Sequence, residues 1–121
     1  VRHVGDPRVV IRIQGMKVFQ NLIQTASPQV ITPLLCDHLG HRNSRVREDC
    51  INLLTVSLLT FPSSDFDLHG LGERVSVCLV DLKRRVRQAS LEIIATIAQY
   101  LGPNKLPFLL AHIEKLEVNN F

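Results

Sequence analysis

The chain has 121 residues, of which 45% are hydrophobic, and a formal net charge of +3 at pH 7. This length and apolar content suit one packed domain or part of a larger one, and they exclude a disordered tail. Aromatic residues make up only 5% and tryptophan is absent, so the core must be built mainly from leucine, isoleucine and valine, as in packed helices.

The three cysteines, Cys36, Cys50 and Cys78, are odd in number and form no CxxC pair. Neither a disulfide framework nor a zinc knuckle is therefore predicted. No charged leader followed by an apolar run opens the sequence, and no apolar stretch is long enough to span a bilayer. We expect a cytoplasmic protein with no membrane partner.

Six helices and no strand are predicted in chain order, at about residues 7–26, 28–39, 44–61, 67–80, 84–101 and 104–117. Ser27-Pro28 is typical of an N-cap followed by proline at the first helical position. Gly40 and Gly102 stand where a left-handed C-cap would end a helix. Gly70 and Gly72 lower the helix propensity of the fourth segment and are expected to delay its start.

The third and fifth predicted helices begin with the same pattern. A shift of 40 positions places Arg45-Val46-Arg47 on Arg85-Val86-Arg87, and a shift of 35 places an upstream copy, Ile11-Arg12, on Val46-Arg47. An internal period in this range, carried by helices, predicts an α-solenoid.

Each copy also carries one small residue at the same position, namely Gly15, Cys50 and Ser90. A helix packed between neighbours needs such a point of close approach. The small residues therefore support the same stacked arrangement.

The repeat resembles a known family. Asp81, followed five residues later by Val86 and then Arg87, is matched by Asp6, Ile11 and Arg12, and this pattern resembles the HEAT repeat, as does Pro33 within a helix. In the middle copy His41 stands at the aspartate position, which departs from an unbroken Asp–Arg ladder.

Within the HEAT class, the segments HLGHRNSRVREDCINLL and LVDLKRRVRQASLEIIATIAQYLG look most like the later repeats of TOG domains, which are tubulin-binding modules. The resemblance is greatest to the Crescerin family of ciliary TOG-array proteins. If the helices are called A and B alternately, the chain begins with a B helix and ends near an A-to-B turn at 118–121. We therefore expect residues 1–121 to form a single all-α HEAT-repeat array that belongs to a longer TOG-like domain.

The charges are unevenly divided between the two edges of such an array. The edge of A-to-B turns carries six basic residues (Arg8, Arg42, Arg45, Lys83, Arg84 and Arg85) and two acidic residues (Asp6 and Asp81). The edge of B-to-A turns carries one basic residue, Lys105, and two acidic residues, Asp65 and Asp67. Solvated turns collect charges by default. The alternative is an edge that meets an acidic partner.

In TOG domains the turns inside each repeat carry the tubulin contacts. The resemblance therefore implies a tubulin-binding set on the A-to-B edge, to which the charge count adds Arg8: Arg8, Arg42, Asn43, Arg45, Lys83, Arg84 and Arg85.

Arg12, Arg47 and Arg87 form a separate group, because each follows a predicted core residue by one position. A partly buried arginine prefers a carboxylate partner. We expect these three side chains to pair with a neighbouring repeat and not to contact tubulin.

Other chemistry is not favoured. Cys36-Asp37-His38 and His41 could supply ligands to zinc, but a structural site usually needs four and the fourth has no source, so no metal and no cofactor are predicted. No nucleophile motif, phosphate loop or HExxH is present, which argues against an enzyme and a small-molecule substrate. The basic turns lack interleaved aromatic residues, which disfavours nucleic acid.

The sequence thus predicts a non-enzymatic module that binds tubulin or microtubules and acts on the cytoskeleton, at the cilium or axoneme. The alternative is a HEAT scaffold that holds a protein or peptide partner on a helix face, and its sign would be an exposed apolar groove.

Overall fold

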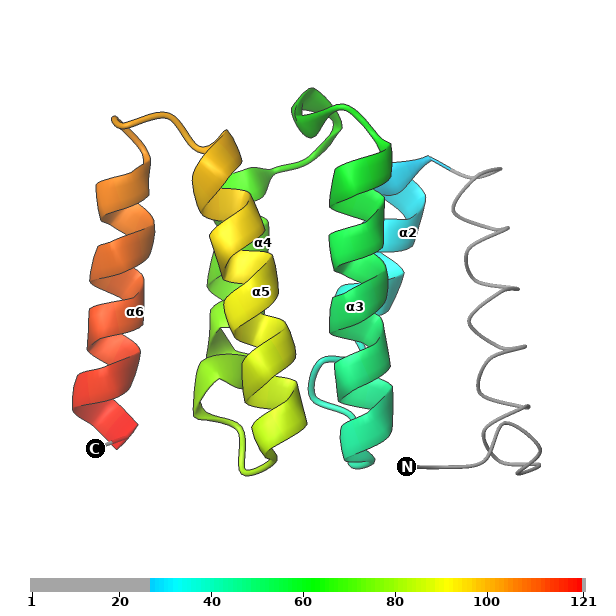
Figure 1. The fold of residues 1–121 in the computed structure, drawn as a ribbon, viewed down its shortest axis with the longest axis vertical. Helices are drawn as coiled ribbons and strands as arrows, with labels where there is room; N and C mark the ends of the chain where they lie inside the picture. Colours follow the sequence, from blue (N-terminus) through cyan, green and yellow to red (C-terminus); the bar gives the residue numbers. More distant parts are fainter. Residues whose placement is uncertain (1–26, 121) are drawn as a thin grey trace.

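The computed structural model describes residues 27–120, and the side chains of residues 117–120 are outside the description. The first predicted helix, at 7–26, lies outside the described residues, together with Arg8, Arg12 and Gly15. Within the described range there are five α-helices and no strand, as Figure 1 shows: α2 (Pro28–Cys36), α3 (Ser44–Thr60), α4 (Leu68–Ser76), α5 (Arg84–Tyr100) and α6 (Leu106–Asn120). Two short 3-10 helices flank α4, η1 (Ser63–Asp65) before it and η2 (Val77–Val80) after it.

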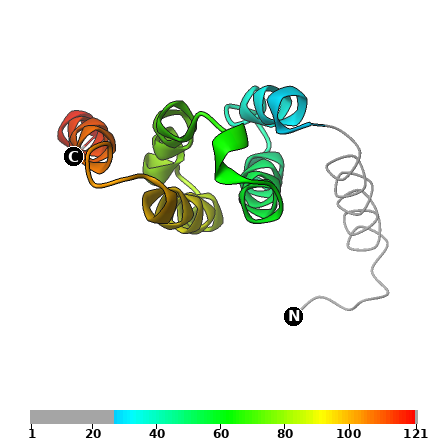
Figure 2. The same ribbon diagram turned by 90° about the horizontal axis from the view of Figure 1, so that it is seen from above.

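The helices are arranged in two layers (Figure 2). α2, α4 and α6 form one layer and α3 and α5 the other, so the chain crosses between the layers at every turn. Across the layers α2 packs against α3 and α4 against α5, and within the layers α3 packs on α5 and α4 on α6. This alternation confirms the predicted α-solenoid.

The core lies between the layers and is aliphatic. Ile51 and Leu54 of α3 and Ile93 and Ile97 of α5 are completely buried, and Val75 of α4 is packed into the same cluster. Aliphatic side chains fill the gap between facing helices and leave the polar faces in water. Aliphatic side chains therefore fill the core without tryptophan.

Small residues mark the places where the helices come closest. Ser90 of α5 is fully buried, and its Oγ donates a hydrogen bond of 2.8 Å to the carbonyl oxygen of Val75 in α4. Gly72 of α4 faces α6, where an added Cβ would lie 2.9 Å from Cδ1 of Leu109. The role predicted for the small position is thus observed at Ser90, whereas the close approach at Gly72 was not predicted.

The predicted helix ends need correction. α2 ends at Cys36 instead of residue 39, and the fourth predicted helix is divided into α4 and the 3-10 helix η2 at Val77. α6 begins at Leu106 and extends to Asn120. No described glycine has a positive φ, so the left-handed C-caps expected at Gly40 and Gly102 are wrong. Ser27 occupies the N-cap position and Pro28 the first turn, but the Ser27 side chain makes no capping hydrogen bond.

No helix in the described part of the chain is long and apolar enough to cross a membrane.

The buried aliphatic contacts should dominate the stability. We expect Leu54→Ala to lower the free energy of unfolding by about 2–5 kcal/mol, because it leaves a cavity between the layers. Leu59 lies on the same helix with 66% of its surface exposed, so Leu59→Ala should change the same quantity by less than about 0.5 kcal/mol. Urea unfolding followed by circular dichroism measures both, and equal losses would contradict this account of the core.

Candidate functional site

Two A-to-B turns lie along one edge of the solenoid. The segment 37–43 connects α2 to α3, and the segment 81–83 connects η2 to α5; both are at the lower edge in Figure 1. The connections from α3 to α4 and from α5 to α6 are at the opposite edge. Residues 40 positions apart in the sequence therefore occupy equivalent places along a single edge.

The two turns are joined by one ion pair. Arg47, in the first turns of α3, donates from Nε to Asp81 Oδ2 at 2.8 Å and from Nη2 to Asp81 Oδ1 at 3.0 Å. The side chains are only 16% and 11% exposed. A bidentate arginine–carboxylate pair fixes both distance and orientation. This confirms for Arg47 the predicted pairing with a neighbouring repeat.

The same arginine also closes its own turn, and this arrangement recurs in the next repeat. Nη1 of Arg47 donates to the carbonyl oxygens of His41 (2.6 Å) and Arg42 (3.2 Å). Nη1 of Arg87 donates to those of Asp81 (2.8 Å) and Leu82 (3.1 Å). Arg87 forms no ion pair with a neighbouring repeat among the described residues, so the expected pairing is confirmed for Arg47 and not observed for Arg87, while Arg12 lies outside the described residues.

His41 and Asp81 have the same local role although their chemistry differs. Nδ1 of His41 accepts the backbone N–H of Asn43 at 2.9 Å, and Oδ1 of Asp81 accepts the backbone N–H of Lys83 at 2.9 Å. The histidine therefore preserves the turn at the position where the HEAT pattern has aspartate. It brings no negative charge to the edge.

The electrostatic environment of Asp81 favours its ionised form. Burial alone would raise the pKa of this carboxyl group, but the hydrogen bonds from Arg47 and Lys83 and the positive charges of Arg47 and Arg87 outweigh it. The pKa therefore lies below its ordinary value of 3.8. Because Asp81 is already paired with Arg47, it offsets less of the basic charge on this edge than the sequence count assumed.

The six predicted contact residues within the described range differ in their exposure and in the hydrogen bonds that they already make. Arg42, Lys83 and Arg84 are exposed in or beside the turns, and Arg45 is half-buried. Asn43 is exposed, but its Oδ1 caps α3 by accepting the backbone N–H of Arg45 at 2.9 Å. Its side chain therefore already has a structural function.

Arg85 differs from the other five in its acidic surroundings. It lines a shallow groove of about 220 Å³ between α3 and α5, where Glu48 and Glu92 are also present. Two carboxylates in the same groove offset its positive charge. Arg85 is thus the weakest member of the predicted set.

Basic side chains at these positions are unfavourable for the helices themselves. Arg45 lies in the first turn of α3, and Arg84 and Arg85 lie in the first turn of α5; neither first turn contains an acidic residue. A helix N-terminus carries a partial positive charge, so acidic residues are stabilising there and basic ones are not. Helix stability therefore does not explain this choice of residues.

The cysteine and histidine side chains considered as metal ligands have other roles. The described residues contain no group of three or more His, Cys, Asp or Glu side chains that could hold a metal ion. Cys36 is buried in the core, and Nδ1 of His38 donates to the carbonyl oxygen of Leu34 at 2.8 Å. Burial raises the pKa of the Cys50 and Cys78 thiols to about 11, which keeps both protonated at neutral pH.

Comparison with known proteins gives consistent relatives. The chain is 42% identical over 120 residues to a human protein named TOG array regulator of axonemal microtubules protein 1. It is 34% identical over 116 residues to the Crescerin-like protein che-12 of Caenorhabditis elegans. These alignments cover 99% and 96% of this chain but only 7% and 9% of the two relatives. No protein-family model matches the chain.

A solved structure agrees with this. The structure described as "Crescerin uses a TOG domain array to regulate microtubules in the primary cilium" superposes with a TM-score of 0.81 at 42% identity. The match covers 94% of this chain and 48% of the solved one.

In class, the chain is therefore a helical solenoid of HEAT repeats with the fold of a TOG domain. More particularly, it is homologous to the Crescerin family of TOG-array proteins.

The Arg47–Asp81 pair should stabilise the solenoid far more than an exposed pair does. Asp81→Asn leaves Arg47 without its counter-charge in a largely buried place, and we expect it to lower the free energy of unfolding by about 2–4 kcal/mol. Arg74 and Asp37 also join neighbouring repeats, at 3.3 Å, but are 50% and 67% exposed. Arg74→Ala is therefore the matched control, with an expected loss below about 1 kcal/mol. Similar losses in the two variants would show that the buried pair has no special importance.

The contribution of this pair should depend on pH. An unfolded chain protonates Asp81 near the ordinary pKa of 3.8, whereas the folded carboxylate has a lower pKa. The stabilisation is therefore complete above about pH 4 and is lost as the pH falls through the folded pKa. The difference in unfolding free energy between the unmodified chain and Asp81→Asn should shrink in urea titrations between about pH 6 and pH 3. A difference that stays constant would contradict the assigned pairing.

Proposed function

We propose that this chain is a non-catalytic tubulin-binding module that regulates microtubules, and that it makes the contact through its edge of A-to-B turns. The proposal takes its partner from the relatives, which are named as regulators of axonemal microtubules and as Crescerin-like. The ciliary or axonemal location is proposed on the same basis. Because the chain spans less than a tenth of those relatives, its own activity is part of the proposal.

One observation carries the assignment to this edge. Exposed basic residues belong to two successive turns on the same edge of the solenoid, Arg42 in one turn and Lys83 in the next, with Arg84 directly after it at the start of α5. The Arg47–Asp81 pair holds the two turns in register. An array of fixed positive charges would orient an acidic surface such as that of tubulin and speed the encounter.

Single contacts on this edge are expected to be weak and their sum appreciable. An exposed ion pair is worth about 0.2–1 kcal/mol, so the four residues Arg42, Arg45, Lys83 and Arg84 would together account for about 1–4 kcal/mol. Such binding should weaken at high salt, because mobile ions screen exposed charges.

The test uses the chain with reversed charges on this edge. The quadruple variant Arg42→Glu, Arg45→Glu, Lys83→Glu and Arg84→Glu should lower affinity for tubulin by at least about tenfold, measured by co-sedimentation with microtubules and by gel filtration with free tubulin. The control reverses the charge of the exposed Lys105, which precedes α6 at the opposite edge, and should bind like the unmodified chain. Unchanged binding by the quadruple variant, with its helical circular dichroism intact, would exclude the proposed edge.

A further inference from the structure

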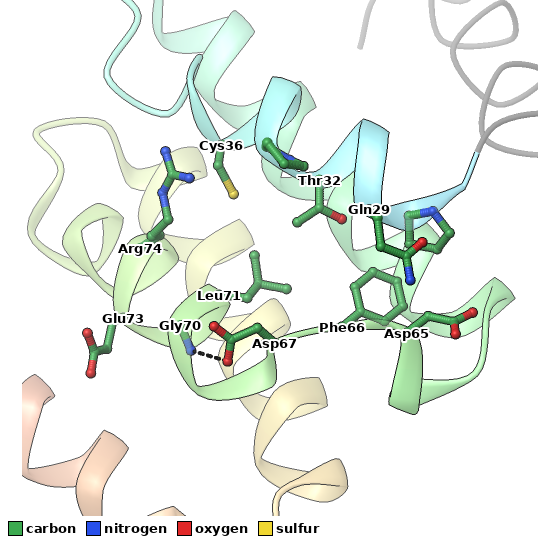
Figure 3. Close-up of a pocket in the computed structure, with 12 residues that line it drawn as sticks. Gln29, Thr32, Cys36, Asp65, Phe66, Asp67, Gly70, Leu71, Glu73 and Arg74 are labelled. Atoms are coloured by element: carbon green, nitrogen blue, oxygen red, sulfur yellow. Dashed lines mark hydrogen bonds between the residues drawn. The ribbon is translucent and has the colours of Figure 1, made fainter.

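A cavity of about 530 Å³ lies between α2 and α4, the two neighbouring helices of one layer (Figure 3). Gln29, Thr32, Pro33 and Cys36 recur every three or four residues and so share the face of α2 that lines it. The segment before α4 closes one end through Phe66, and α4 contributes the opposite wall. The volume is within the range of about 300–1,000 Å³ found for ligand sites.

The floor of this cavity is apolar. Leu71 and Cys36 are only 4% and 5% exposed, and the ring of Phe66 and the two prolines of α2 add further carbon surface. An aliphatic side chain of a ligand would lose its contact with water here at little polar cost.

The rim of the cavity is acidic. It has three acidic residues, Asp65, Asp67 and Glu73, and one basic residue, Arg74. The guanidinium of Arg74 is already paired with Asp37. Asp67 Oδ1 accepts the backbone N–H of Gly70, and Glu73 lies 2.7 Å from His69 Nε2. No cation contacts the Asp65 carboxylate among the described residues. The charge of the rim therefore favours a cationic ligand and disfavours phosphates, nucleic acid and anionic lipid.

Two polar groups of α2 lack a usual hydrogen-bond partner. Oγ1 of Thr32 is buried without a hydrogen-bond partner. Pro33 lies inside the helix and has no N–H, so the carbonyl oxygen of Gln29, four residues earlier, lacks its usual helical donor. Groups of this kind are normally satisfied by hydrogen bonds in protein structures.

We propose that this cavity binds a short, extended, basic peptide segment of a protein partner, with an aliphatic side chain in the cavity and a lysine or arginine at its acidic rim. α2 has nine residues, and a helix of this length extends for about 13 Å, which corresponds to about four residues of extended chain. The site contains none of the residues proposed to contact tubulin, although Cys36 and Arg74 extend it towards the segment 37–43. A peptide can therefore occupy it while tubulin occupies the turns.

A fluorescence-anisotropy titration tests this with defined probes. One is a labelled hexapeptide of alternating leucine and lysine, and the other alternates leucine and glutamate. The basic peptide should bind at least about tenfold more tightly than the acidic one, and less tightly at high salt. Equal affinities, or no binding of the basic peptide, would overturn the proposal.

Variants locate the binding. Asp65→Lys reverses one of the negative charges of the rim, and Gln29→Trp places a bulky side chain at the mouth of the cavity from an exposed position. Each variant should lower the affinity for the basic peptide by at least about tenfold. Glu114→Lys makes the same kind of charge change on an exposed part of α6 and should have no effect. Peptide binding that survives both cavity variants would assign it to another surface and overturn the proposal.

Two further readouts separate the alternatives. Asp65→Lys and Gln29→Trp should leave tubulin co-sedimentation unchanged, whereas the quadruple edge variant should leave peptide binding unchanged, so the two proposals can fail independently.

Gel filtration of the chain alone detects self-association. A dimer that Gln29→Trp dissociates would assign the cavity to a second copy of the chain and would overturn the peptide proposal.

Discussion

The pairing of Arg47 with Asp81 is the interaction on which the rest of this structure depends. Helix pairs in a solenoid touch only their neighbours, so the relative position of two turns is set by the contacts between adjacent repeats. Arg47 contacts its own turn through two carbonyl oxygens and the next turn through both carboxylate oxygens of Asp81. A single guanidinium thus orders both turns. Without it, the two turns would be related only through the packed core between α3 and α5.

Much of the fold could be predicted from the sequence because it is periodic. The copies at Arg45-Val46-Arg47 and Arg85-Val86-Arg87 fixed the start of two helices, and the alternation of helices then determined which turns share an edge. The pairing of Arg47 was also predictable, since an arginine directly after a core residue needs a carboxylate nearby. These inferences use spacing along the chain, which the sequence contains in full.

Features that depend on contacts between distant residues were not predictable in the same way. Asp81 looked like an exposed charge, and only its partner 34 residues away shows that it is largely neutralised. His41 replaces an aspartate in the pattern, yet it makes the same turn hydrogen bond. Gly72 looked like a weakness in a helix, but it allows Leu109 of α6 to approach closely. The cavity between α2 and α4 was not predictable because its shape depends on how the two helices are placed relative to each other.

The described residues thus present a basic edge of turns and an acidic cavity between helices as two separate surfaces. The central claim is that the two turns act together as one tubulin contact because Arg47 and Asp81 hold them in register. Hydrogen–deuterium exchange of the chain with and without tubulin tests it most directly. The account predicts added protection at residues 40–45 and 81–85 together, with none at 61–67 or 101–105. Protection of only one of the two turns, or of the opposite edge, would contradict it.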